Sequence, residues 1–97
     1  IMILHTLSAP PGSGAFRDCL SALAAEDAII LLGDGVYAAL PDNPHLESLL
    51  RSGAQVHVLE FDARAAGVVV RDAGLAAIDM EGFVTLTERY PRQMAWF

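Results

Sequence analysis

The chain contains one potential sulfur nucleophile, Cys19. A thiol reacts as the thiolate, which requires solvent access and a nearby positive charge or helix N-terminus. Arg17 is two residues away, but Cys19 also falls on the apolar stripe that Phe16, Leu20 and Leu23 form at helical spacing. Free cysteines are among the most often buried residues, so this pattern favours an unreactive, buried thiol. The sequence therefore predicts no catalytic residue, with Cys19 as a weak candidate.

Three histidines, His5, His45 and His57, have side chains that act elsewhere as bases or metal ligands. His5 ends the first predicted strand and His57 lies within the third, so the two could approach each other near the strand ends of a parallel sheet. No H-x-x-x-H or C-x-x-C pattern accompanies them, and no metal site is predicted. We interpret each as a structural, hydrogen-bonded histidine, with His45 exposed in the first turn of a helix.

A glycine-rich loop, Gly12-Ser13-Gly14, follows a predicted strand and opens a predicted helix, where nucleotide and flavin folds bind phosphate. The loop lacks a third glycine and a Walker lysine, and Asp34 is more simply a turn residue between two glycines. Only Tyr37 is suitably positioned to stack on a flavin, so no cofactor is predicted. Asp79 and Glu81 precede the last predicted helix, and we interpret them as capping acids rather than an acid–base pair.

The composition of the chain argues against a nucleic-acid-binding protein and a membrane-spanning protein. Its 97 residues are 54% apolar and 19% charged, with a formal net charge of −6. One domain spanning residues 1–97 is expected, and its apolar excess predicts contact with another subunit. The basic residues are six scattered arginines, which argues against direct nucleic-acid binding. With a lone cysteine, no signal peptide and no apolar run near the ~18 residues of a membrane span, we expect a cytoplasmic protein.

Strands and helices alternate along the chain. Continuous apolar runs predict strands at residues 1–4 and 27–32, and further strands are predicted at residues 55–59, 75–78 and 93–97. Helical spacing and capping residues predict helices at residues 15–25 after Ser13 and 44–52 between Asn43 and Gly53. A last helix, which carries Phe83, Leu86 and Tyr90, is predicted after a turn at residues 79–82 and ends before Pro91. Residues 62–66 fit one or two helical turns, and 67–74 stay unassigned. This order predicts a single-domain α/β fold with a mainly parallel sheet of about five strands flanked by helices, in flavodoxin-like or Rossmann-like layers.

The last predicted strand ends on two large aromatic residues, Trp96 and Phe97. Either the core of this domain or another subunit must cover them, and the sequence leaves both alternatives open. Aromatic residues are enriched at protein interfaces, so Tyr37, Trp96 and Phe97 are the predicted interface residues.

Four segments of the chain resemble the TusB/DsrH family. Residues 2–7 (MILHTL) and 91–96 (PRQMAW) resemble its termini, residues 31–39 (LLGDGVYAA) resemble its LLxDGVYAA segment, and residues 78–87 (IDMEGFVTLT) resemble its IDYxGFVxLT segment. The segments follow the family order and spacing, so the resemblance covers essentially the whole chain.

The resemblance implies a DsrE-like fold and membership of a heterohexameric sulfur-relay complex with TusC/DsrF-like and TusD/DsrE-like subunits. Sulfur would pass through this complex between the carriers TusA and TusE or DsrC. In this family the B/H subunit is regarded as a non-catalytic subunit of the sulfurtransferase complex, and the main acceptor cysteine is on another subunit.

Three functions follow as alternatives. The leading one is a TusBCD complex that acts in tRNA processing by 2-thiolation of the wobble uridine. The second is a DsrEFH-type sulfur-oxidation complex in which Cys19 accepts persulfide sulfur. The third is a stand-alone, flavodoxin-type ligand-binding domain.

Overall fold

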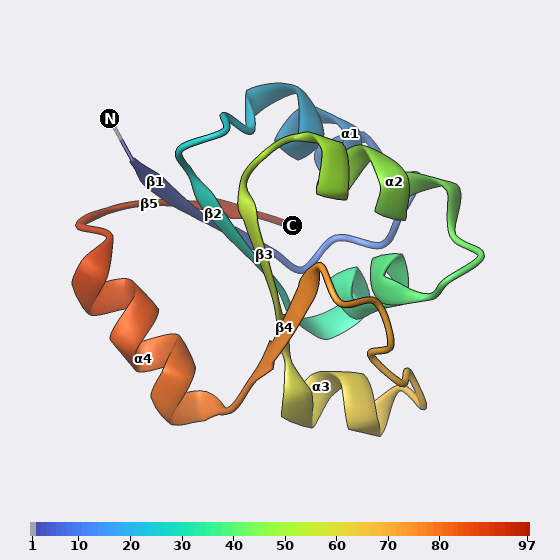
Figure 1. Ribbon diagram of the computed structural model, residues 1–97. Coiled ribbons are helices and arrows are strands. Elements are labelled where there is room, and N and C mark those ends of the chain that lie inside the picture. The colour runs from blue at the N-terminus through green and yellow to red at the C-terminus, as the bar shows by residue number, and fades with distance from the viewer. Residues whose placement is uncertain (1) are drawn as a thin grey trace.

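Five strands form one sheet in the computed structural model, which describes residues 2–97 (Figure 1). The strands are β1 (Ile3–Leu7), β2 (Ala28–Leu31), β3 (Gln55–Leu59), β4 (Leu75–Ile78) and β5 (Arg92–Trp96). They lie in the order β4-β3-β2-β1-β5, and each neighbouring pair is parallel. The predicted α/β fold with a parallel sheet is confirmed. Because all strands are parallel, their last residues lie along one edge of the sheet, the carboxyl edge.

The first strand differs from the prediction. The predicted strand begins at Ile1, which lies outside the described residues, and β1 continues as far as Leu7. His5 therefore lies in the middle of β1 and not at its end. The fully buried β2 fits the expectation that a parallel strand flanked by helices is apolar throughout.

Five helical segments connect the strands. They are α1 (Gly14–Ala22), the 3-10 helix η1 (Gly33–Ala39), α2 (Pro44–Arg51), α3 (Glu60–Ala65) and α4 (Met80–Arg89). The predicted N-caps are confirmed, since Ser13 Oγ accepts from the Phe16 N–H at 3.2 Å and Asn43 Oδ1 accepts from the His45 N–H at 2.9 Å. Asp79 Oδ1 likewise accepts from the Gly82 N–H at 2.8 Å, so the capping interpretation holds for Asp79.

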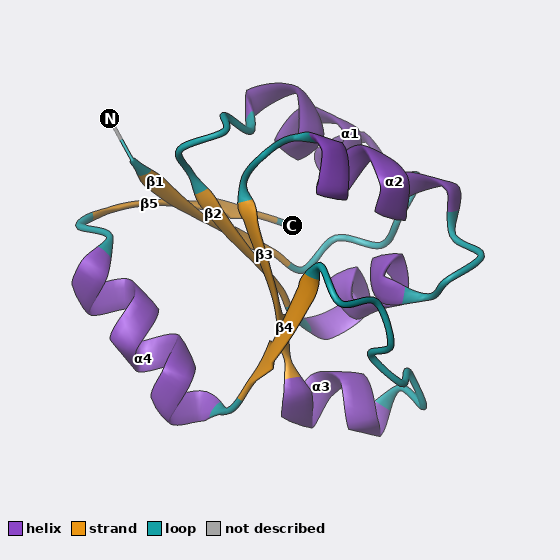
Figure 2. Cartoon of the chain, viewed as in Figure 1, coloured by secondary structure: helices purple, strands orange, loops and turns teal. Residues whose placement is uncertain are grey.

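The helices are distributed unequally over the two faces of the sheet. Residues of α1, α2, η1 and α3 pack in one apolar cluster with one face of the strands (Figure 2). Among the helices within residues 2–97, only α4 contributes buried residues to the cluster on the other face. The side chains of His5 and His57 follow opposite faces, because His5 is level with Ile29 and Val56 whereas His57 is level with Ile30. The expectation that these two histidines approach each other is therefore wrong.

Three connections depart from the predictions. Helix α1 ends at Ala22 rather than at residue 25, and the glycine turn after β2 is the start of η1. Helix α3 begins at Glu60, so it is longer than the turns predicted at 62–66. Residues 67–74 form a loop in which Val68 is buried and Val69 exposed. None of the helices within residues 2–97 has the length and apolar character that crossing a membrane requires.

Gly35 fixes the position of η1 against β1. A Cβ atom at this position would overlap the backbone carbonyl oxygen of Leu7, which itself accepts the Leu32 N–H at 3.1 Å. The carbonyl cannot move away without breaking that hydrogen bond. Only glycine allows this approach of η1 to the end of β1.

Replacement of Gly35 by alanine is expected to lower the free energy of unfolding by about 3 kcal/mol, because the new methyl group must displace backbone atoms. Gly14→Ala is the matched control, since nothing lies within 4 Å of its added Cβ. That control is expected to be neutral or stabilising by less than about 1 kcal/mol, as helical glycine is unfavourable. Urea titration of both variants measures the difference in the free energy of unfolding. Equal stabilities of the two variants would contradict the conclusion that only glycine fits at position 35.

Candidate functional site

Cys19 lies on the inner side of α1 and is completely buried. It packs in the same apolar cluster as Phe16, Leu46 and Leu49. Burial raises the pKa of its thiol to about 12, so the thiol is neutral near pH 7. The buried interpretation of Cys19 is confirmed. Arg17, the cation considered as its activator, instead donates from Nη1 to the Gly12 carbonyl at 2.6 Å.

A buried polar network joins His5, Asp27 and Trp96. His5 Nε2 lies 2.8 Å from Asp27 Oδ2, and Trp96 Nε1 donates to His5 Nδ1 at 3.1 Å. An indole N–H can only donate, so Nδ1 is the acceptor and Nε2 carries the proton given to Asp27. Asp27 also accepts from the backbone N–H groups of Ile3 and Ala24, each at 3.0 Å. Every polar atom of the His5 ring is therefore satisfied, as predicted for a structural histidine.

The electrostatics of Asp27 reflect this network. Burial alone raises the pKa of its carboxyl group, but the hydrogen bonds from His5 and from the Ala24 and Ile3 N–H groups outweigh burial and hold the pKa below its ordinary value. Asp27 and its link to Trp96 are not predicted from the sequence. The available signal was a carboxylate directly before the buried β2, in a chain with a single tryptophan.

The other two histidines differ from their predictions. His57 has both ring nitrogens buried, and neither finds a hydrogen-bond partner among residues 2–97, so the prediction of a hydrogen bond is wrong. Loss of solvent around His57, and then the charge of Arg89, lower the pKa of this imidazole. His45 is half-buried and not exposed, because its ring meets the edge of Phe16 with centroids 5.1 Å apart.

The remaining candidate residues have local structural partners. Ser13 in the Gly12-Ser13-Gly14 loop caps α1, and Asp34 is an exposed residue in the first turn of η1. Within the described part of the chain, no cluster of three His, Cys, Asp or Glu side chains has the arrangement of a metal site. The structure thus brings none of the predicted catalytic candidates together.

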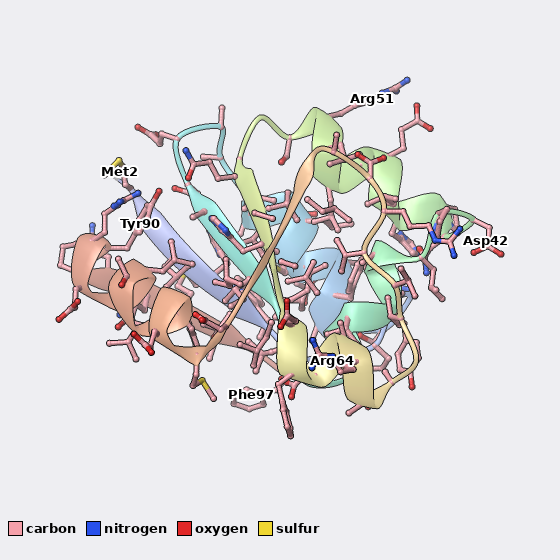
Figure 3. The ribbon with its side chains drawn as sticks, turned by 60° about the horizontal axis from the view of Figure 1, so that its bottom comes forward. Met2, Asp42, Arg51, Arg64, Tyr90 and Phe97 are labelled. Carbon is pink, nitrogen blue, oxygen red and sulfur yellow. The ribbon has the colours of Figure 1, made fainter. Side chains whose placement is uncertain are left out.

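Exposed apolar side chains lie instead along the carboxyl edge, with Phe61 and Met80 close together after neighbouring strands and Phe97 apart from them after β5. Phe61 follows β3, Met80 follows β4 and Phe97 follows β5, with exposed fractions of 76%, 61% and 89%. Of the predicted interface residues, Phe97 and Tyr37 are exposed, whereas Trp96 packs partly on the core of its own domain. Figure 3 shows Phe97 on the same side of the molecule as Arg64 of α3. Phe61 and Met80 are not predicted as surface residues from the sequence, because their position depends on strand order.

The fold defines the class of protein first. The ychN protein from Escherichia coli has the same fold with a TM-score of 0.79 and 17% identity, over 98% of this chain and 97% of that one. Protein Tm0979 from Thermotoga maritima gives a TM-score of 0.68 with 24% identity over 91% and 93% of the two chains. The chain is therefore a small, single-sheet α/β domain of this structural type.

Sequence comparison then gives the family. The family model described as "DsrH like protein" matches residues 9–93, and the chain belongs to the DsrH family. Protein TusB of Escherichia coli K12 is 39% identical over 95 residues, which cover 97% of this chain and 100% of that protein. Protein TusB of Pectobacterium parmentieri is 38% identical over the same coverage. The resemblance to the TusB/DsrH family is confirmed, and membership supports a role as a sulfur-relay subunit.

Acidification is expected to lower the free energy of unfolding through the loss of the Asp27 network. The folded-state pKa of Asp27 is lowered, so its stabilisation is complete above pH 5, where the unfolded carboxyl is also ionised, and declines as the pH falls below about 4. Asp27→Asn is expected to cost about 3 kcal/mol at pH 7 and to flatten this acid dependence. Urea titrations between pH 3 and 7 measure both effects. Asp18→Asn, at an exposed position on α1, is the control and should keep the acid dependence of the original chain.

Proposed function

We propose that this chain is a non-catalytic subunit of a heterohexameric sulfur-relay complex of the TusBCD type, which acts in the cytoplasm in 2-thiolation of the tRNA wobble uridine. Its partners in this proposal are TusC/DsrF-like and TusD/DsrE-like subunits, with TusA and TusE or DsrC as the carriers. The near-complete alignment with proteins named TusB supports the TusBCD type over other sulfur relays.

The state of Cys19 is the observation that carries the non-catalytic role. A persulfide acceptor must present a thiolate to the donor, and Cys19 is fully buried with its pKa raised to about 12. Because this chain contains no other cysteine, the transferred sulfur must be carried by a different subunit. The same observation counts against the alternative in which Cys19 accepts sulfur in a sulfur-oxidation complex.

The charge of the chain supports the absence of direct contact with tRNA. A phosphate backbone is bound by clustered Lys and Arg side chains, whereas this chain has twelve acidic and six basic residues. Two of the six arginines, Arg51 and Arg64, already pair with Glu47 and Glu60 on their own helices. In this proposal the chain contributes to the assembly, and the tRNA substrate is handled elsewhere.

Co-expression with the TusC/DsrF-like and TusD/DsrE-like subunits is expected to yield one stable assembly with two copies of each chain. Size-exclusion chromatography with light scattering gives its mass, and native mass spectrometry gives the stoichiometry. A chain that elutes as a monomer beside both partners would contradict the proposal. To test the pathway, the three subunits together should restore 2-thiouridine in tRNA of an Escherichia coli strain that lacks its own three.

Alkylation measures the accessibility of Cys19. Iodoacetamide is expected to modify Cys19 at least about 100-fold more slowly in the native chain than in urea, because the thiol must wait for an opening of the core. Mass spectrometry of timed samples gives both rates. In the reconstituted complex, Cys19→Ala is expected to leave sulfur transfer within about twofold of the original, whereas loss of transfer would favour the alternative role for Cys19.

A further inference from the structure

We propose that the apolar surface at the ends of β3 and β4, formed by Phe61, Met80 and Val84, is the docking surface for a different subunit of the assembly. The proposal rests on the function proposed above and identifies the surface that would serve it. Isolated apolar side chains are common on protein surfaces, but neighbouring ones mark interaction sites. Here β3 and β4 are neighbouring parallel strands, so Phe61 and Met80, which follow them, lie close together at the carboxyl edge. Phe97 follows β5, which β1 and β2 separate from β3, and it is not part of this surface.

The surface contains a groove between the starts of α3 and α4. This groove has a volume of about 440 Å³ and is lined by Glu60, Phe61, Arg64, Asp79 and Met80. Met80 also borders a second depression of about 330 Å³, which continues along α4 past Glu81, Val84 and Thr85. The two depressions share Met80 and form one concave, apolar strip. A protein side chain inserted beside Phe61 and Met80 would occupy a central, water-excluded position, which is where interfaces concentrate their binding energy.

The base of this groove is held in place by contacts within the domain. Asp62 Oδ2 accepts the Gly33 N–H at 2.8 Å, which joins α3 to the start of η1. Asp79 caps α4, and its position is thereby fixed beside Met80. The first turns of α3 and α4, which carry this surface, are therefore held in place by hydrogen bonds within the domain. A docking partner has to order few of these residues when it binds.

The acidic side chains around the strip favour a positively charged partner. Segments 33–40, 59–65 and 79–85 together carry five acidic residues, Asp34, Glu60, Asp62, Asp79 and Glu81, and a single basic residue, Arg64. Arg64 is already bonded to Glu60, with Nη2 and Oε1 3.1 Å apart. Two copies of this surface would bring like charges together, which disfavours self-association. The fitting partner is a different chain that presents an apolar side chain flanked by Lys or Arg.

Substitutions in the assembled complex test the docking surface. Phe61→Ser and Met80→Ser are each expected to weaken assembly with the co-expressed partners by roughly tenfold or more. Val69→Ser is the matched control, since Val69 is 58% exposed in the loop between α3 and β4. Dissociation constants from sedimentation velocity and unfolding midpoints of the isolated variants are compared. Weaker assembly of the two edge variants, with the unfolding midpoint and the Val69→Ser complex unchanged, would support the proposal.

A charge reversal tests the nature of the partner. Glu81→Lys is expected to weaken assembly by roughly tenfold at low salt, and by less at high salt, if the partner carries Lys or Arg around its apolar side chain. Glu88→Lys is the control, because Glu88 is exposed two turns further along α4. An equal effect of both substitutions, or no effect of either, would overturn the stated chemistry of the partner.

Hydrogen exchange gives a result that does not depend on any variant. Segments 59–65 and 79–85 are expected to gain protection when the chain enters the assembly. If the assembly forms without that protection, or if the Phe61 and Met80 variants assemble with unchanged affinity, the proposed docking surface is wrong. Either result leaves the proposed function unaffected. Dimers of the isolated chain that Phe61→Ser abolishes would overturn the choice of a different chain as occupant. Failure of the unaltered chain to assemble would instead count against the proposed function.

Discussion

The hydrogen-bonded chain from Asp27 through His5 to Trp96 connects the two ends of the sequence across the sheet, in addition to the pairing of β1 with β5. His5 lies at the centre of β1, which is the pairing partner of both β2 and β5. Asp27 precedes β2, and Trp96 is the last residue of β5. Polar groups buried without partners are costly, so this network is stable only when all three side chains are present together. Its geometry therefore requires the observed strand order around β1.

The unequal coverage of the sheet has consequences for the outer strands. Four helical segments pack on one face, but α4 alone crosses the other. Parallel strands are usually buried on both faces, and here that holds for β2, whereas β5 is exposed at four of its five residues. The domain thus has a well-packed centre, and its apolar excess lies at the periphery of the sheet. A chain with this distribution is suited to contact other subunits over its edges.

Burial of the thiol and exposure of the carboxyl edge are complementary features. Helix α1 must pack its apolar stripe against the sheet, and Cys19 belongs to that stripe, so the packing that stabilises the domain also removes the thiol from solvent. Open α/β sheets usually bind small molecules at the carboxyl ends of their strands. In this chain that position is occupied by Tyr37, Phe61, Met80 and Phe97, whose exposed apolar atoms are better suited to a protein surface.

The local features of the protein could be predicted from its amino-acid sequence. Apolar runs, helical spacing and the caps Ser13, Asn43 and Asp79 gave most elements, and the stripe containing Cys19 indicated a buried thiol, because these signals depend on residues a few positions apart. Features that depend on strand order and register are visible in the tertiary structure alone. The tertiary structure joins His5 to Asp27 and Trp96, 22 and 91 positions away, separates His5 from His57, and places Phe61 and Met80 on one edge. Such contacts leave no periodic pattern in the sequence, since any strand order is compatible with the same local propensities.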